Sequence, residues 1–411
     1  MGTPGSAPFQ NARLYRSRGS VQKVVIRIDL ARLYRISSPS LQEVFSCDPA
    51  LVLLPSIATI WCFYMSNHNK GVGMQEGTKD ARPAWTTRLK NYEGAENRRA
   101  LIQLADTTLP YLAIFFTMLI LARAQAPLWL ILFLALPGGA FLMRSFIIFH
   151  DCCHGSYLSS RKANDLLGRA LGLLVFTPFA EWRRSHGNHH VTAGNLDRRG
   201  VGDIWTMTVS EYEGSSALLR LRYRLYRNPL VLFVLGPFFI FVVMNRMPTR
   251  GSRAAQTRDL LIHDLALAST GALLGLTFGL LPWLLVQGSI LLFGGMAGIW
   301  MFYVQHQFDP SYWRHGEGWS FFDAAMEGSS WYRLPAPLQW ITGNIGLHHI
   351  HHLAPRIPNY RLQSCLEAIP ELRLKNHLEF GRSLRAVSLN LWDEVAGALI
   401  PFRALRGRAV G

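Results

Sequence analysis

Residues 109–149 read LPYLAIFFTMLILARAQAPLWLILFLALPGGAFLMRSFIIF and run directly into HDCCH at residues 150–154. These 41 residues carry only two charged side chains, Arg123 and Arg144. A helix rises about 1.5 Å per residue and a bilayer core is about 30 Å thick, so this length suits two membrane spans. The polar segment RAQAP at 123–127 is the predicted turn between spans at about 107–122 and 127–149.

A second apolar stretch, residues 265–304, contains no charged residue and predicts two further spans, at about 265–281 and 283–304 with a turn near Pro282. Together the two stretches predict an all-α integral membrane protein with four transmembrane helices in two hairpins. The remaining chain, roughly 150–258 and 305–411, would form a helical cap on the cytosolic side.

Two shorter apolar stretches, 166–179 and 229–244, are too short to cross a bilayer. Arginines flank 229–244 on both sides, and Lys and Arg near a membrane segment mark its cytoplasmic side. We therefore expect both stretches to be interfacial or re-entrant. This topology places a multi-pass protein in the cytoplasmic (inner) membrane with both chain ends inside.

The chain is basic, with 42 Lys and Arg against 26 Asp and Glu and a formal net charge of +16. Such an excess favours nucleic acid, a membrane surface or an acidic partner. The basic residues flank apolar segments instead of forming a tail or a recognition helix, so we expect no nucleic-acid partner. The five cysteines form no CxxC pair, which favours a reducing compartment.

Ten of the fourteen histidines cluster in four places beside the predicted spans. Residues at i, i+3 and i+4 share a helix face, so these spacings aim two or three imidazoles at one point. Imidazole suits iron, zinc, copper and nickel, and nine or ten ligands exceed the demand of one metal and fit two. The four places are HDCCH at 150–154, HGNHH at 186–190, His306 just beyond the fourth span, and HHIHH at 348–352.

The position of the histidines bears on the class of protein. A transporter would place polar ligands inside its spans, near the bilayer midplane. Here the spans are nearly free of ionisable groups and the histidines stand at their ends, which favours an enzyme; a non-catalytic metal or lipid transporter is the alternative. The remaining histidines, His68, His263, His315 and His377, are expected to be solvated.

The three boxes HDCCH, HGNHH and HHIHH resemble those of the membrane fatty-acid desaturase family. The likeness covers about residues 74–385 and points to the bacterial and cyanobacterial acyl-lipid branch, which includes omega-6 desaturases. It continues in WRRSH at 182–186, GNLD at 194–197, GDIWT at 202–206 and LAPRIPNY at 353–360.

This resemblance implies two iron ions on histidine ligands. Asp151 is expected to accept a hydrogen bond from a ligand imidazole, and Asn344 to orient a metal-bound water. HxxHH leaves His349 as a spacer, and no catalytic residue is expected beyond the ligands. The expected ligands are His150, His154, His186, His189, His190, His306, His348, His351 and His352.

The family also implies the reaction. A lipid methylene C–H is neither acidic nor polarised, so general acid–base groups cannot break it, whereas O₂ chemistry on a metal can. Two hydrogens would leave adjacent carbons of a membrane lipid acyl chain; hydroxylation on the same scaffold is the alternative outcome. The chain shows neither a G-x-G-x-x-G fingerprint nor a fused haem domain, so electrons would come from a separate protein.

That electron donor is expected to be a small acidic redox protein of the ferredoxin type. Its candidate docking face is the run of Arg220, Arg222, Arg224 and Arg227. Charge complementarity of this kind acts mainly on the rate of association.

The first 73 residues do not read like the rest of the family. They contain no patterned helix and no signal peptide. We therefore expect translation of the natural protein to start at Met74, so that residues 1–73 would be an extension that the natural protein lacks. The apolar run 50–65 is the alternative, a short extra span. The domains would be 74–385, the desaturase domain, and 386–411, a C-terminal tail.

Overall fold

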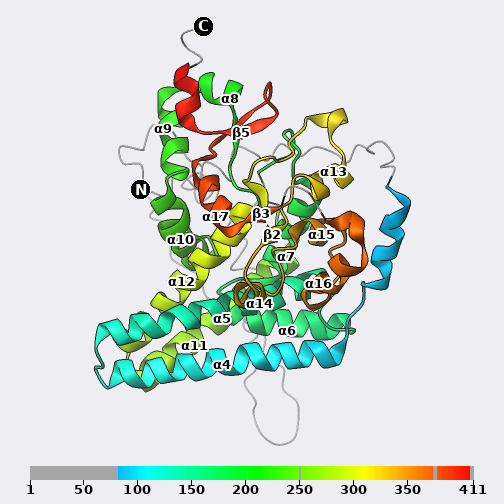
Figure 1. Cartoon of the computed structure of the whole chain (residues 1–411). Helices are drawn as coiled ribbons and strands as arrows, with labels where there is room; N and C mark the ends of the chain where they lie inside the picture. Colours follow the sequence, from blue (N-terminus) through cyan, green and yellow to red (C-terminus); the bar gives the residue numbers. More distant parts are fainter. Residues whose placement is uncertain (1–81, 201, 250, 374–376, 408–411) are drawn as a thin grey trace, which may run out of the picture. The chain divides into compact units, whose positions relative to one another are not determined.

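The computed structural model describes residues 82–200, 202–249, 251–373 and 377–407 (Figure 1). All of them belong to one compact unit, residues 52–411. The expected start at Met74 and the apolar run 50–65 lie outside the described residues.

Four helices of the described chain are long and apolar enough to cross a membrane, which confirms the predicted all-α membrane fold. A link of four residues, 124–127, separates the first two, and Gly279 alone separates the other two. These helices are α4 (Asn97–Arg123), α5 (Leu128–His154), α11 (Ala254–Phe278) and α12 (Leu280–His306).

The turn between α11 and α12 lies three residues before the predicted one. Gly279 has φ +100°, a backbone conformation that side chains with a Cβ rarely adopt. Pro282 instead occupies the first turn of α12, where a residue without an N–H loses no intrahelical hydrogen bond. The proline was therefore a helix-start signal, and the glycine makes the turn.

The helices also extend beyond the predicted spans. The helix α4 begins at Asn97, ten residues before the predicted boundary, and α5 continues through the whole HDCCH motif to His154. Hydropathy identifies only the part of a helix that suits lipid. The helix itself continues beyond that part until a capping residue ends its backbone hydrogen bonds. The C-terminal end of α5 is capped by Gly155, which has φ +69°.

The helix α5 is the centre of this bundle. It packs against α4, α12 and α6 (Arg161–Leu174). At the crossing with α12 the backbones nearly touch, because a Cβ added to Gly139 would lie 2.7 Å from the backbone nitrogen of Gly294. Small residues at such a crossing let membrane helices approach closely. The close contact fixes α5 and α12 relative to each other near their middles, and the C-terminal ends of these two helices carry His150 and His306.

Shorter elements make up most of the remaining described chain. Residues 166–179 lie mostly in α6, which is too short to span. The helix α9 (Ala217–Tyr226) and the segment Val231–Arg246 form a pair bent by 63°, a broken span or a re-entrant loop. The other helices are η2 (Ala84–Asn91), α7 (Phe179–Thr192), α8 (Val209–Glu213), η3 (Val231–Leu235), α10 (Gly236–Val242), η4 (Met244–Arg246), η5 (Gly316–Gly318), α13 (Phe321–Met326), α14 (Ala336–Ile341), α15 (His348–Leu353), α16 (Asn359–Ala368), η6 (Pro370–Leu372), α17 (Phe380–Ser383), η7 (Leu384–Ser388) and η8 (Phe402–Gly407).

The strands are few and short. β4 pairs with β1 in parallel and with β5 in antiparallel, and β2 pairs with β3 in parallel. They are β1 (Met207–Thr208), β2 (Tyr332–Arg333), β3 (Leu378–Glu379), β4 (Leu391–Asp393) and β5 (Ala398–Ile400).

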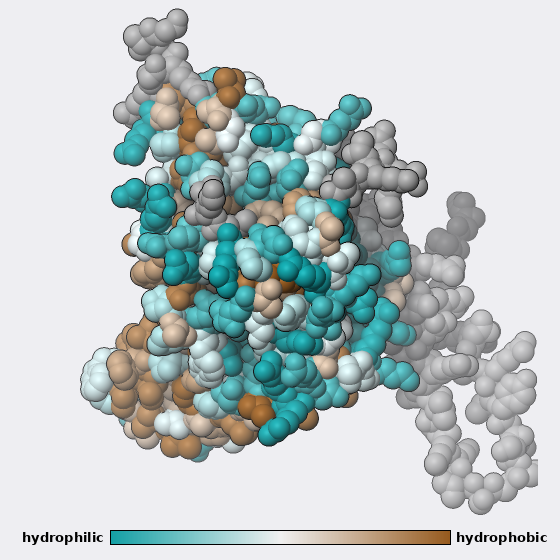
Figure 2. All heavy atoms as spheres, turned by 45° about the vertical axis from the view of Figure 1, so that its right-hand side comes forward, coloured by the Kyte–Doolittle hydropathy of each residue, from teal (hydrophilic) through white to brown (hydrophobic). Residues whose placement is uncertain are grey.

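The surface has an apolar part and a hydrophilic part. Figure 2 shows hydrophobic side chains gathered at the lower left, over the long helices, and hydrophilic ones over most of the rest of that face. Large exposed hydrophobic residues on the long helices include Phe133, Leu276 and Leu281. Contact with lipid accounts for their exposure, since water-soluble domains rarely display apolar surface of this extent.

Candidate metal centre

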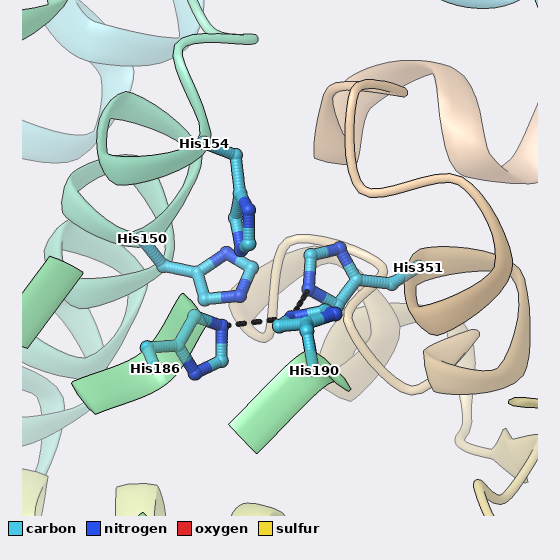
Figure 3. A group of neighbouring side chains, drawn as sticks. All are labelled: His150, His154, His186, His190 and His351. Carbon is cyan, nitrogen blue, oxygen red and sulfur yellow. Dashed lines mark hydrogen bonds between the residues drawn. The ribbon is translucent and has the colours of Figure 1, made fainter. Parts of the chain in front are cut away.

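Nine histidines converge into two groups whose ring nitrogens, one from each residue, lie within 4.8 Å of one another. Figure 3 shows the side chains of the first group pointing toward one another from separate helices. The first group is His150, His154, His186, His190 and His351; the second group is His189, His306, His348 and His352. These nine are the residues expected as ligands from the sequence.

The helices α7 and α15 each contribute to both groups. Successive residues of a helix are about 100° apart around its axis, so His189 and His190 on α7 face different groups. On α15, His351 and His352 are divided in the same manner. The helix α5 supplies only the first group and α12 only the second, through His306.

The two groups adjoin. The rings of His190 from the first group and His352 from the second stack with their centroids 4.2 Å apart. Those of His351 and His348 lie 5.4 Å apart. The arrangement is therefore one centre with two parts.

The nitrogens inside each group suit cations. In the first group the Nε2 atom of His190 lies 3.0 Å from the Nε2 atoms of both His186 and His351. In the second group the Nε2 atom of His306 lies 3.0 Å from those of His189 and His348. Facing imidazole nitrogens cannot all be donors, so lone pairs are directed into each group.

Several of these nitrogens have no hydrogen-bond partner. The Nε2 atoms of His150, His154 and His352 are buried and unpaired. An unsatisfied buried polar atom costs about 1–3 kcal/mol. A metal ion in each group would satisfy them, and an all-imidazole donor set is suited to iron among other transition metals. The residues present thus fit two metal ions.

The outward-facing nitrogens are held by acceptors. The Nδ1–H of His150 donates to Asp151 over 3.0 Å, and that of His189 donates to Asp203 over 2.5 Å. The Nδ1–H of His306 donates to the backbone oxygen of Gly328 over 3.2 Å. Such partners fix the ring and its tautomer and leave Nε2 free for a metal.

Asp151 is itself held in place. Its Oδ2 accepts hydrogen bonds from the backbone and side-chain nitrogens of Asn359, at 2.7 and 2.8 Å. Gln103 on α4 in turn donates to the side-chain oxygen of Asn359 over 2.7 Å. A buried chain of hydrogen bonds thus leads from α4 to His150 of the first group.

Sequence reasoning missed the place of Asp203. It lies in the GDIWT segment, fourteen residues after His189, in a loop whose path no helical spacing predicts. The backbone nitrogen of Gly200 also donates to its carboxylate, over 3.0 Å. The sequence offered only one indication of this role, an acidic residue shortly after the second box, and that indication is weak by itself.

Two residues near the third box stand apart from the groups. The Nε2–H of His349 donates to the backbone oxygen of Leu372 over 3.0 Å, so its ring is turned away from both groups. The side chain of Asn344 donates to the backbone oxygen of Asn359 over 3.3 Å. The water-orienting role of Asn344 stays a prediction.

Five buried imidazoles of α7 and α15 have lowered pKa values. Burial, and then the neighbouring imidazoles, hold the pKa values of His186, His190, His348, His351 and His352 well below 6.5. Neutral rings at pH 7 keep the lone pairs that a metal needs.

Two expectations from the sequence are wrong. His263 is buried, not solvated, because α6 packs over it and its Nε2–H donates to the backbone oxygen of Gly172. Arg222 and Arg227 are also buried, so the expected docking face of four arginines is not a single exposed surface. The spacing of the arginines along the sequence does not indicate which side of α9 packs against the rest of the protein.

Comparison with known proteins gives a consistent result. The family model described as fatty acid desaturase matches residues 127–383. A fatty acid desaturase of Bacillus subtilis is 42% identical over 323 residues, which cover 78% of this chain and 91% of that protein.

Two proteins of Synechocystis sp. are more distant. The sn-1 oleoyl-lipid 12-desaturase is 28% identical over 55% of this chain and 64% of that protein. The sn-1 acyl-lipid omega-3 desaturase (ferredoxin) is 27% identical over 56% of this chain and 65% of that protein. The matches thus span slightly less than two thirds of these two relatives.

Proposed function

Because this chain belongs to the fatty acid desaturase family, and is therefore a desaturase enzyme, we propose that it uses two irons and O₂ to form a C=C bond in a lipid acyl chain. The observation that carries the proposal is the convergence of nine histidines from four helices into two adjoining groups. When bound, the irons would supply the one-electron and O₂ chemistry that an unactivated C–H bond requires.

The protein's own residues would hold and orient this centre. The nine histidines would be the ligands, and Asp151, Asp203 and the Gly328 carbonyl would keep three of the rings in one tautomer. Trp182 stacks on the His186 ring with centroids 4.3 Å apart, which restricts its rotation and covers one side of the first group.

The substrate and electron donor follow from the relatives. The Synechocystis proteins are named as oleoyl-lipid and acyl-lipid desaturases, one of them with ferredoxin. We propose membrane-lipid acyl chains as substrate and a separate ferredoxin-type protein as donor. The net charge of +16 supports an acidic donor, whose association should slow as salt screens the attraction.

We propose that the centre lies on the cytosolic side of the cytoplasmic membrane. The far turns of the two helix pairs would then lie outside, with Ala124 in the first turn and Leu281 just after the second, and Arg253 before α11 would lie inside. Single cysteines at these exposed positions, labelled in intact cells with an impermeant maleimide, test this. Labelling of Arg253→Cys from outside would contradict the topology; the three described cysteines are buried and give little background.

The reaction itself is tested by fatty-acid analysis. Cells expressing the chain should contain an unsaturated fatty acid absent from control cells, identified by gas chromatography and mass spectrometry. His348→Gln should abolish it, whereas His349→Gln should keep it, because Gln can still donate to the Leu372 carbonyl and His349 stands outside both groups. A hydroxylated product, or product from the His348→Gln variant, would contradict the proposal.

A further inference from the structure

A pocket with a volume of about 620 Å³ lies at the C-terminal end of α9, against η7. The described residues that line it, within 224–229 and 384–402, include no Asp or Glu. The polar and charged lining residues are Arg224, Arg227, Asn228, Arg385, Ser388 and Asn390. This set is called the arginine pocket below.

Arg227, at the inner side of the arginine pocket, is 3% exposed and meets only neutral acceptors. Its guanidinium donates to Tyr303 Oη and Gln307 Oε1, both over 3.0 Å, and to the backbone oxygens of Trp205 and Leu389. Its Nε atom is buried without a partner. Buried charges in proteins are normally paired, because desolvation is otherwise uncompensated.

Another buried arginine of this protein shows the contrast. Arg144 on α5 is as deeply buried, and its guanidinium lies 3.3 Å from the carboxylate of Asp106. Arg227 has no such carboxylate among the described residues. An anion entering the arginine pocket would provide the missing charge.

The other two arginines suit the same anion. The guanidinium of Arg224 donates to Tyr212 Oη over 2.5 Å and lies 4.6 Å from the ring centre of Phe402, so it is held at the pocket. Arg385 is exposed on η7. Guanidinium groups bind phosphate through parallel hydrogen bonds, and three of them around one pocket favour a phosphate group.

The surroundings indicate where that phosphate comes from. Leu384, which lines the pocket, is 58% exposed, and Leu230, next to the lining residue Pro229, is 61% exposed. The apolar segment with the exposed Phe238 follows, and it belongs to the bent pair that is apolar enough for a broken span or a re-entrant loop. Exposed apolar side chains beside cationic ones are typical of a membrane interface.

We propose that the arginine pocket binds the phosphate of a membrane phospholipid headgroup. This site is separate from the histidine groups, but it is linked to them by contact. Gln307, which accepts from Arg227, directly follows His306 of the second group and donates to Thr206 over 3.0 Å. A bound phosphate would therefore stabilise the segment that leaves α12 after a proposed metal ligand.

The proposal is tested with the purified full-length protein in detergent, titrated with dihexanoyl phosphatidylglycerol. Binding is followed by the rise in unfolding temperature. Arg224→Gln and Arg385→Gln should each raise the apparent Kd by about tenfold, the loss of about one charge-assisted hydrogen bond. Arg382→Gln is the matched control, since Arg382 is exposed on the adjoining α17 and outside the pocket; it should bind like the wild type.

Two further ligands separate the sources of phosphate. Dihexanoyl glycerol, which lacks the phosphate, should give no shift, and inorganic phosphate should bind much more weakly than the phospholipid. Equal binding of inorganic phosphate would overturn the membrane assignment. These two arms use only the wild type, so they decide even if Arg224→Gln does not fold.

A third experiment tests the alternative that an acidic protein, and not a phospholipid, binds the arginine pocket. If Arg385→Gln leaves phospholipid binding unchanged but weakens donor-dependent turnover, the pocket is a protein-docking site and the proposal is wrong. If phospholipid binding falls while desaturation with saturating donor persists, the proposal holds independently of the proposed reaction.

Discussion

The two histidine groups share the helices α7 and α15 and differ in the third contributor. The first group has five histidines and draws on α5, which lies at the centre of the membrane bundle. The second group has four and draws on α12 through His306 alone. The carboxylate behind the first group is tied through Asn359 to α4, whereas Asp203 behind the second accepts from a loop backbone.

This difference indicates a division of roles. If the histidines bind metal as proposed, the first group would offer five donors backed by a braced carboxylate. The second group would offer four, and the acceptors behind it, Asp203 and Gly328, lie in loops. The experiments below are arranged by the size of the effect that this asymmetry predicts.

The largest effect is expected from removing a ligand of the smaller group. His306→Ala should lower bound iron from about two atoms per chain towards one and abolish desaturation, since metal held by histidines depends on their number and geometry. His154→Ala, which leaves four histidines in the first group, should retain more iron. Iron per purified protein, measured together with lipid product, gives the answer.

An opposite result would remove the asymmetry. Two irons and near-normal product in His306→Ala would rule out the ligand role of His306. Equal iron loss in both variants would mean that the number of donors does not distinguish the groups.

Loss of the carboxylates should have the next largest effect. Asp151→Asn and Asp203→Asn should each reduce metal affinity or activity by about 10–100-fold, because a ligand imidazole loses its charged acceptor. The rate of iron release to a chelator measures this. Asp165→Asn is the control, since Asp165 pairs with Arg183, is partly exposed and belongs to neither group; it should release iron at the wild-type rate.

A smaller effect is expected from the remote support of the first group. Gln103→Leu leaves the buried side-chain oxygen of Asn359 without its donor and should destabilise the fold by about 1–3 kcal/mol. Combined with Asp151→Asn its effect should be non-additive, because both act on one hydrogen-bonded chain; combined with Asp203→Asn it should be additive. Denaturation of the four proteins in each cycle tests this, and equal coupling in both cycles would contradict separate supports.

The smallest effect concerns a surface cluster that joins the segments following α7 and α12. His315 donates to Asp197 over 2.5 Å and to Glu394 over 3.0 Å. These hydrogen bonds raise the pKa of His315 above 6.5. For Asp197, burial raises the pKa, but the hydrogen bonds from His315 and the Gly316 N–H together outweigh it and hold the pKa below 3.8. For Glu394, the hydrogen bond from His315 lowers the pKa below 4.5.

The sign of the pH dependence follows from these shifts. The histidine's contribution is complete below pH 6.5 and is lost as the pH rises through its raised pKa; that of the carboxylates is complete above about pH 4.5 and is lost in acid. The stability difference between wild type and His315→Gln should therefore be greatest between these values. It should stay below about 1 kcal/mol, because the groups are solvent-exposed. Thermal unfolding at pH 5.5 and 8.5 compares the two; a larger difference at pH 8.5 would contradict the assignment.

The features that could be predicted from the sequence are those with a local signature. Long apolar stretches with few or no charges predicted the four spans, and the i, i+3 and i+4 spacings predicted that the histidines of each box face one point. His306 could be predicted from its position at the end of a span. The division of the histidines into two groups was not predictable, because it depends on how α5, α7, α12 and α15 meet. The same holds for Asp203 and for the buried sides of Arg222 and Arg227, which tertiary packing decides.

The division of α7 and α15 between the groups has a consequence for biosynthesis. The ribosome delivers His190 well before His348, and at about 5–20 residues per second the interval is on the order of ten seconds. Throughout that interval the first group lacks one of its five histidines and the second group lacks at least two of its four. Both groups therefore reach their full set only once α15 has been made. A chain that stops just before α15 would enter the membrane with four histidines of the first group and two of the second.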